Sequence, residues 1–169
     1  MTELASLIAR DEIRALLTEY AHCADSGRTE RMLELFAPDA LLEATDAPAC
    51  LGTSEIRRYF EHAAASARRH LASPYLRHHL ASIHIELDGA DHARSTSYFL
   101  AITDTGPDHW GRYRDTLRHD GTTWLVHHRR LDLEGCVAGG WLDRHRKEQE
   151  AEARAAVRSA GPTAETTPS

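Results

Sequence analysis

The feature that most constrains this fold is a change in the spacing of apolar residues after Pro74, from helical steps to alternation. Four alternating stretches follow, separated by turn signals such as Asp88-Gly89 and Asp120-Gly121. Strands joined by short turns pair antiparallel, so this half of the chain predicts a four-stranded meander. The predicted strands cover residues 77–87, 93–103, 110–119 and 123–133.

Before Pro74, apolar residues recur every three or four positions, which indicates helices with one buried face. The order of helices and then strands predicts an α+β fold, in which a curved antiparallel sheet folds around three helices. The predicted helices run from about Leu4 to near Ala24, from Thr29 to just before Pro38 and from Thr53 to about Arg69, with a short strand at 40–44 and a loop at 45–52.

The bulk composition of the 169 residues suits one domain with one core, which we place at residues 1–142. Residues 143–169 are predicted to form a charged tail with a frayed helix and a disordered end. The net charge of -6 mixes both signs, so no nucleic-acid surface is expected. No apolar run reaches the ~18–20 residues of a membrane span, and no signal peptide is evident, so we expect a cytoplasmic protein. Three cysteines without a CxxC pair predict reduced thiols and no metal site.

Two polar residues stand near the end of the first predicted helix. Tyr20 lies on the apolar stripe, so its hydroxyl enters the core and needs a polar partner. Asp25 is about 140° away around a regular helix, so the two side chains converge only if the helix ends near Ala24. Ser26-Gly27 supplies a stop signal for the helix. The ordinary alternatives are a core tyrosine bonded to a backbone carbonyl and a solvated aspartate at a helix end.

The adjacent pair His78-His79 opens the first long strand. Neighbouring strand residues point to opposite faces, so only one of the two can enter a given pocket. Alternation places His79 on the apolar face with Ile83, whereas a β-bulge would place His78 there. The ordinary alternative is one exposed histidine and one satisfied in the core.

Other charged and aromatic residues have simple structural explanations. The run 127–130, His-His-Arg-Arg, is expected at a solvated or interface edge, with an inward member that could line a pocket. Arg112, Arg114 and Asp115 are expected to form surface salt bridges. Trp110 and Trp124 are expected in the core or the wall of a pocket.

Several strings together resemble one known family. Tyr20-Ala-His-Cys-Ala-Asp25 resembles the Tyr-x4-Asp that ends the first helix of SnoaL-like proteins, in the nuclear transport factor 2-like superfamily. Residues 78–98 resemble that family's histidine-bearing strand and hairpin, and residues 111–124 resemble its closing hairpin. The resemblance covers about residues 5–133. It implies a cone-shaped curved antiparallel sheet, with helices closing one end of a mostly apolar cavity, and dimers are common in the family.

The sequence is similar in particular to the scytalone dehydratase and bile-acid 7α-dehydratase branch. That resemblance implies an acid/base cluster of Tyr20, Asp25 and a strand histidine that matches His78. We therefore rank His78 first and keep His79 as the alternative. Two positions differ from the pattern: Ser82 stands where the family often has Asn, and Ala101 where the dehydratases have a further polar residue.

The resemblance implies a cofactor-independent dehydratase, isomerase or cyclase acting on a bulky apolar carbonyl compound, such as a polyketide or steroid-like metabolite. It also makes a homodimer reasonable. Alternatives are a non-catalytic module that binds a small molecule, or the small structural subunit of a ring-hydroxylating oxygenase. Epoxide hydrolysis needs an Asp-Arg-Asp arrangement, which the spacing supports weakly. The candidate substrate-binding residues are Phe60, Ser82, Tyr98, Trp110 and Trp124.

Overall fold

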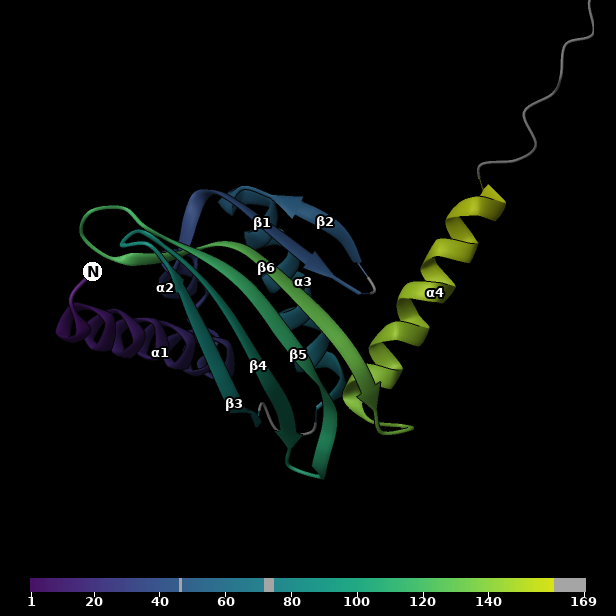
Figure 1. Cartoon of the computed structure of the whole chain (residues 1–169). Coiled ribbons are helices and arrows are strands. Elements are labelled where there is room, and N and C mark those ends of the chain that lie inside the picture. The colour runs from purple at the N-terminus through teal and green to yellow at the C-terminus, as the bar shows by residue number, and fades with distance from the viewer. Residues whose placement is uncertain (46, 72–74, 160–169) are drawn as a thin grey trace, which may run out of the picture.

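One curved sheet and four helices make up residues 1–45, 47–71 and 75–159, the part of the chain that this computed structural model describes (Figure 1). The α+β class is confirmed. The helices are α1 (Glu3–Ser26), α2 (Thr29–Leu33), α3 (Thr53–His70) and α4 (Trp141–Ser159). The strands are β1 (Phe36–Ala44), β2 (Ala47–Leu51), β3 (Leu76–Asp88), β4 (His92–Thr103), β5 (Gly106–His119) and β6 (Trp124–Cys136).

The sheet has the strand order β2-β1-β6-β5-β4-β3, so the four long strands form the expected antiparallel meander. The expectation of an antiparallel sheet throughout is wrong at one place, because β1 pairs parallel with β6. The predicted loop at 45–52 is largely strand β2. Pro48 favoured the prediction of a loop. Proline is tolerated in this strand because β2 is an edge strand that pairs with β1 alone.

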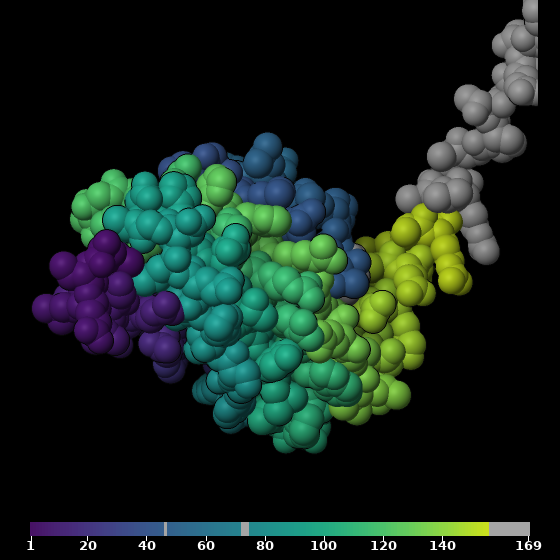
Figure 2. All heavy atoms as spheres, in the orientation of Figure 1, coloured from purple at the N-terminus to yellow at the C-terminus, as the bar shows by residue number. Residues whose placement is uncertain are grey.

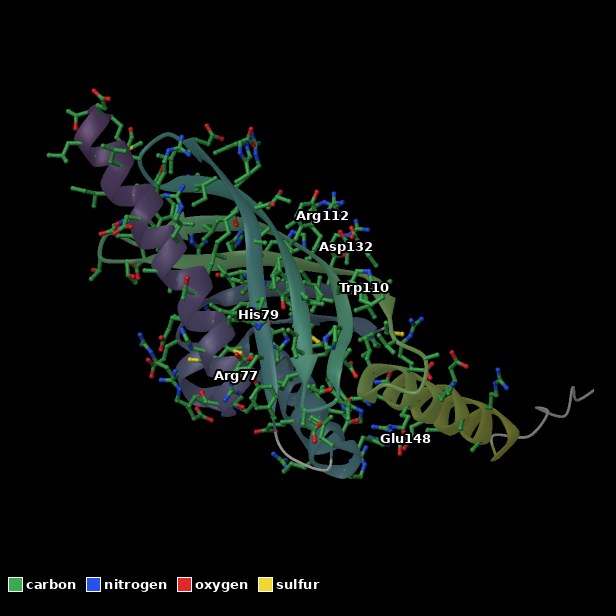
Figure 3. All side chains as sticks on the ribbon, turned by 90° about the horizontal axis from the view of Figure 1, so that it is seen from below. Arg77, His79, Trp110, Arg112, Asp132 and Glu148 are labelled. Carbon is green, nitrogen blue, oxygen red and sulfur yellow. The ribbon has the colours of Figure 1, made fainter. Side chains whose placement is uncertain are left out.

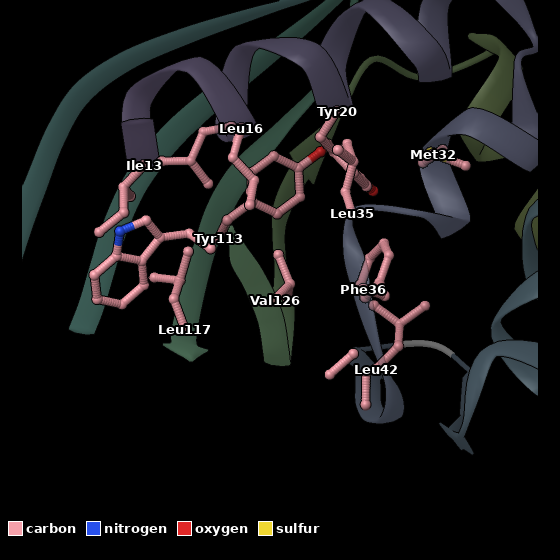
Figure 4. Close-up of a cluster of buried hydrophobic side chains, with 14 of the residues drawn as sticks. Ile13, Leu16, Tyr20, Met32, Leu35, Phe36, Leu42, Tyr113, Leu117 and Val126 are labelled. Atoms are coloured by element: carbon pink, nitrogen blue, oxygen red, sulfur yellow. The ribbon is translucent and has the colours of Figure 1, made fainter. Parts of the chain in front are cut away.

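Helix α1 packs its apolar stripe into the core, with Ile13, Leu17 and Tyr20 at most 3% exposed (Figure 4). The helix continues to Ser26, two residues beyond Ala24, and ends at the Ser26-Gly27 stop signal. Gly27 then stops it with a left-handed φ of 67°, which suits glycine. The second helix is shorter than predicted, since Leu33 ends it and Phe36 already belongs to β1.

Strand β3 contains a β-bulge at Ser82, where the pairing with β4 skips a residue between Ala81 and His84. Ser82 has a positive φ of 51°. The extra residue reverses the alternation, so His78 and Leu80 share the inner face with Ile83 and Ile85 beyond the bulge. His79 is exposed on the opposite face (Figure 3). Alternation without a bulge, which favoured His79, therefore gave the wrong face.

Helix α4 begins at Trp141, so the predicted boundary between residues 142 and 143 falls inside it. Its first turn is buried through Trp141 and Leu142, and its far end projects from the body (Figures 1 and 2). Glu148 joins α4 to α3 by ion pairs with Arg69 and His70. Residues 160–169, for which a disordered end is predicted, lie outside the described residues.

The outer face of the meander is not covered by a helix in the view of Figure 2. Tyr98 is 45% exposed and Trp110 is 40% exposed on this face. Arg112 lies over the Tyr98 ring and pairs with Glu134. Among the helices in the described residues, none is long and apolar enough to cross a membrane.

Candidate active site

A cavity of about 920 Å³ opens between the inner face of the sheet and the helices. This is large enough for a ligand of several fused rings. Apolar and aromatic side chains make up most of its wall, and a few polar groups interrupt them. The polar or titratable residues on the wall include Tyr20, Asp25, His78, His109, Tyr113 and His145.

Asp25 and His78 form a close pair on this wall. The Nδ1 atom of His78 lies 2.7 Å from Oδ1 of Asp25, and the two side chains are only 12% and 11% exposed. The backbone N–H of His78 also donates to both carboxylate oxygens, at 3.0 and 3.2 Å. Asp25 thus fixes the ring and directs its Nε2 atom away from the carboxylate.

Tyr20 lines the same cavity but has different neighbours. Its ring packs edge-on against Phe60 and Tyr113, and the Arg129 guanidinium lies 4.0 Å from its centroid. Burial raises the pKa of Tyr20, and the charge of Arg129 opposes this only in part. Tyr20 therefore keeps its proton near neutral pH and can act as a donor.

Tyr20 and Asp25 both line the cavity. The sequence argument required α1 to end near Ala24 for this, but the helix continues to Ser26. The cavity is wide enough to take both side chains from different sides of the last two turns of α1. Asp25 reaches across to β3, whereas Tyr20 points toward β5 and β6.

Four of the predicted substrate-binding residues lie outside this cavity, and only Phe60 lines it. Ser82 is the exposed bulge residue, while Tyr98 and Trp110 are on the outer face. Trp124 is 3% exposed but belongs to the core beneath His119. The inner face of β4 carries Ser97, Phe99 and Ala101 instead, and Phe99 lines the cavity.

Arg129 and Asp115 form a buried ion pair under the tyrosines, not the predicted surface bridges. Arg129 is 0% exposed and Asp115 is 3% exposed, and two hydrogen bonds of 2.7 and 2.9 Å join them. Burial alone would lower the pKa of Arg129, but the charge and hydrogen bonds of Asp115 raise it above its usual range. Arg129 is the inward member of the histidine-arginine run, whereas Arg114 pairs with Asp132 on the outer face.

A second carboxylate–histidine pair, Asp108-His109, was missed from the sequence. The Nδ1 atom of His109 lies 2.8 Å from Oδ2 of Asp108, and both residues are at most 6% exposed. The adjacent pair Asp91-His92 has the same sequence pattern but lies on the surface. Alternation within β5 is the sequence signal that could have distinguished the buried Asp108-His109 pair from the exposed Asp91-His92 pair. The register shift between Ala101 and Ile102 of β4 interrupts this alternation.

Within the described residues, no group of three or more His, Cys, Asp or Glu side chains is arranged to hold a metal ion. The polar groups of the cavity include two imidazoles that each face a carboxylate and two protonated phenols. Such groups move protons and stabilise oxyanions.

The fold and this constellation define a cone-shaped α+β protein with a deep apolar cavity and polar groups inside. A family model for the SnoaL-like domain matches residues 5–130. The chain therefore belongs to the SnoaL-like family, as the motifs predicted. A sequence search of curated proteins gave no match.

Solved structures share the fold at low sequence identity. A proposed scytalone dehydratase from Novosphingobium aromaticivorans DSM 12444 superposes with a TM-score of 0.70 at 18% identity, covering 80% of this chain and 91% of the other. A nuclear transport factor 2-like protein with a cystatin-like fold from N. aromaticivorans gives 0.69 at 24% identity, covering 80% and 89%. The hexachlorocyclohexane dehydrochlorinase LinA-type3 from Novosphingobium barchaimii LL02 gives 0.69 at 13% identity, covering 80% and 93%.

Proposed function

We propose that this protein is a cofactor-independent acid/base enzyme acting on a bulky, mostly apolar carbonyl compound. The observation that carries the proposal is the Asp25–His78 pair on the wall of a large apolar cavity that also exposes Tyr20. Two structural relatives are named for eliminations, a dehydratase and a dehydrochlorinase, which is consistent with this chemistry.

In the proposed mechanism, Nε2 of His78 removes a proton from the carbon next to the carbonyl group. Asp25 accepts a hydrogen bond from Nδ1 and stabilises the imidazolium that results. Tyr20 donates a hydrogen bond to the oxygen on which negative charge develops. Each positioned acid or base supplies about 10²–10⁴-fold in rate. The same enolate leads to elimination, isomerisation or ring closure, so the shape of the substrate selects the product.

A probe of enolate formation tests the proposal without knowledge of the natural substrate. A bulky ketone such as 4-phenylbutan-2-one is incubated in D₂O, and deuterium uptake beside the carbonyl is followed by NMR. We expect wild-type protein to accelerate uptake and the H78Q variant to lose about 10²-fold or more of that acceleration. The H79Q variant is the matched control, because His79 is exposed on the other face.

Two outcomes contradict the proposal. Equal uptake with wild-type protein and H78Q would show that His78 is not the base. Tight binding of the ketones without any exchange would favour the alternative, a non-catalytic binding module. That alternative agrees with the apolar wall but leaves the fixed Asp25–His78 geometry without a role.

A further inference from the structure

His78, Ala101 and His109 form one row across the inner face of the sheet. His78 of β3 pairs with Ala101 of β4, and Ala101 pairs with His109 of β5. Strands lie about 4.8 Å apart, so residues two strands apart begin roughly 10 Å from each other. The two imidazole centroids are nevertheless only 6.0 Å apart, at 77°. Ala101 permits this approach because its side chain is a single methyl group.

The two histidines are bound alike. In each ring Nδ1 faces a carboxylate, at 2.7 Å for His78 and 2.8 Å for His109. Both carboxylates therefore select the tautomer or charge state with a proton on Nδ1, and Nε2 lies on the far side of each ring. Both rings line the same cavity, with Phe99 in contact with each of them.

Asp108 accepts hydrogen bonds from the backbone of α4 as well as facing His109. The backbone N–H groups of Trp141 and Leu142, in the first turn of α4, donate to it at 2.5 and 3.2 Å. The Trp141 ring also packs against His109, with centroids 5.4 Å apart, and bonds to Ser66 of α3. Asp108 is thus fixed as an ionised acceptor, and an ionised acceptor favours the imidazolium form of His109.

We propose that His109 is a second catalytic residue, a general acid that works opposite His78, with Asp108 as its positioning residue. This inference rests on the proposed function. In dehydration of a β-hydroxy ketone, Nε2 of His78 takes the proton beside the carbonyl, and that electron pair forms the new C=C bond. The C–O bond breaks, and Nε2–H of His109 protonates the departing hydroxyl to give water. The proton on His78 then returns to His109 through water, and both rings regain their starting states.

A series of leaving groups tests this role. The probes are 4-aryloxy-4-phenylbutan-2-ones that release either 4-nitrophenol, a good leaving group, or 4-methoxyphenol, a poor one. General acid catalysis matters most for the poor leaving group. We expect H109Q to slow release of 4-methoxyphenol about 10²-fold and to leave release of 4-nitrophenol within a few-fold of wild type. H78Q should slow both by the same factor.

The surface pair Asp91-His92 supplies the matched control, since its Nδ1–carboxylate distance is 3.0 Å but both residues are about two-thirds exposed. H92Q should behave as wild type with both probes. Equal slowing of both probes by H109Q would assign His109 a purely structural role and overturn the inference. A steep dependence of the wild-type rate on the leaving group would also overturn the inference, and this measurement does not depend on whether a variant folds. Absence of turnover by wild type with every probe would instead overturn the proposed function itself.

Discussion

Arg129 is the most completely enclosed charge in the described part of the chain, and its surroundings explain why it is tolerated. Asp115 binds it through two nitrogens, Ser95 donates to Asp115 at 3.2 Å, and the faces of Tyr20 and Tyr113 lie 4.0 and 4.5 Å from its guanidinium carbon. A buried charge of this kind is stable only while it is paired. The pair and the two aromatic rings therefore hold the floor of the cavity in one arrangement.

The residue-scale prediction concerns this pair. D115N keeps the size of the side chain but leaves Arg129 buried without a counter-ion, so we expect a loss of about 3–5 kcal/mol in the free energy of unfolding. Urea unfolding measures it. D132N, which removes the shared partner of the exposed Arg114 and Arg130 on the outer face, should change the free energy by less than about 1 kcal/mol. Similar values for both variants would contradict the account.

At this scale, sequence reasoning found the groups that helical spacing and family motifs mark. Tyr20 stands on an apolar stripe and Asp25 at a fixed distance after it, so both were candidates, and both line the cavity. Neither helical spacing nor a family motif singles out His109 or Arg129. Whether they point inward depends on the registers of β4, β5 and β6, which include irregular steps that a single sequence does not reveal.

At the scale of elements, the bulge at Ser82 decides which histidine enters the cavity. Alternation is reliable along a regular strand, but one inserted residue reverses every side chain on one side of it. Ser82 adopts a left-handed φ of 51° although it is not a glycine. Its residue type therefore does not predict the bulge. The family motif ranked His78 first without using alternation, so the bulge did not mislead it.

Helix α4 depends on a residue from another element, since Asp108 of β5 accepts hydrogen bonds from its first turn. Burial alone would raise the pKa of Asp108, but hydrogen bonds from His109, Trp141 and Leu142 lower it below its usual range. A carboxyl with a lowered folded-state pKa stabilises the fold fully above its unfolded pKa. That stabilisation is lost as the pH falls through the folded value.

The element-scale prediction follows from this sign. The difference in unfolding free energy between wild type and D108N should be fully present at pH 5, below the range in which His109 titrates, and should shrink once the pH falls below about 4. Urea unfolding at a series of pH values, monitored by circular dichroism, measures the difference. A gap that stays constant or widens as the pH falls below 5 would contradict the assignment of Asp108 as an ionised helix cap.

At the scale of the whole molecule, no helix of the described residues covers the outer face of the meander in the view of Figure 2. Trp110 and Arg112 of β5 lie near each other on this face (Figure 3). The register of β4 and β5 places exposed Tyr98 opposite Arg112. Exposed aromatic residues and arginine are the types enriched at the centres of protein interfaces. We propose that a second copy of the chain covers this face, as in a homodimer.

The molecule-scale prediction is that light scattering after size-exclusion chromatography gives the mass of two chains for wild type and of one chain for W110E. A buried charge without a partner is costly at an interface centre. L4E is the control, because Leu4 is 67% exposed in the first turn of α1 and not on the sheet. A monomeric wild type, or a W110E variant that stays dimeric, would contradict the proposed dimer.

The architecture was predictable at this scale because the change of period after Pro74 marks where helices give way to the meander. The parallel pairing of β1 with β6 was not predictable, because it joins segments about 90 residues apart and leaves no local pattern in the sequence. Phe36 pairs there with Val126, and Leu42 with Arg129. This pairing joins β1 and β2 to the meander in one sheet.

The central claim is that Tyr20 and His78 act on one bound molecule, and a structure of the protein with a planar phenolate, an enolate mimic, tests it most directly. The account predicts the phenolate oxygen within hydrogen-bond distance of the Tyr20 hydroxyl and a ring carbon facing Nε2 of His78. A phenolate that fills the cavity while contacting only one of these two residues, or that binds elsewhere, would contradict it.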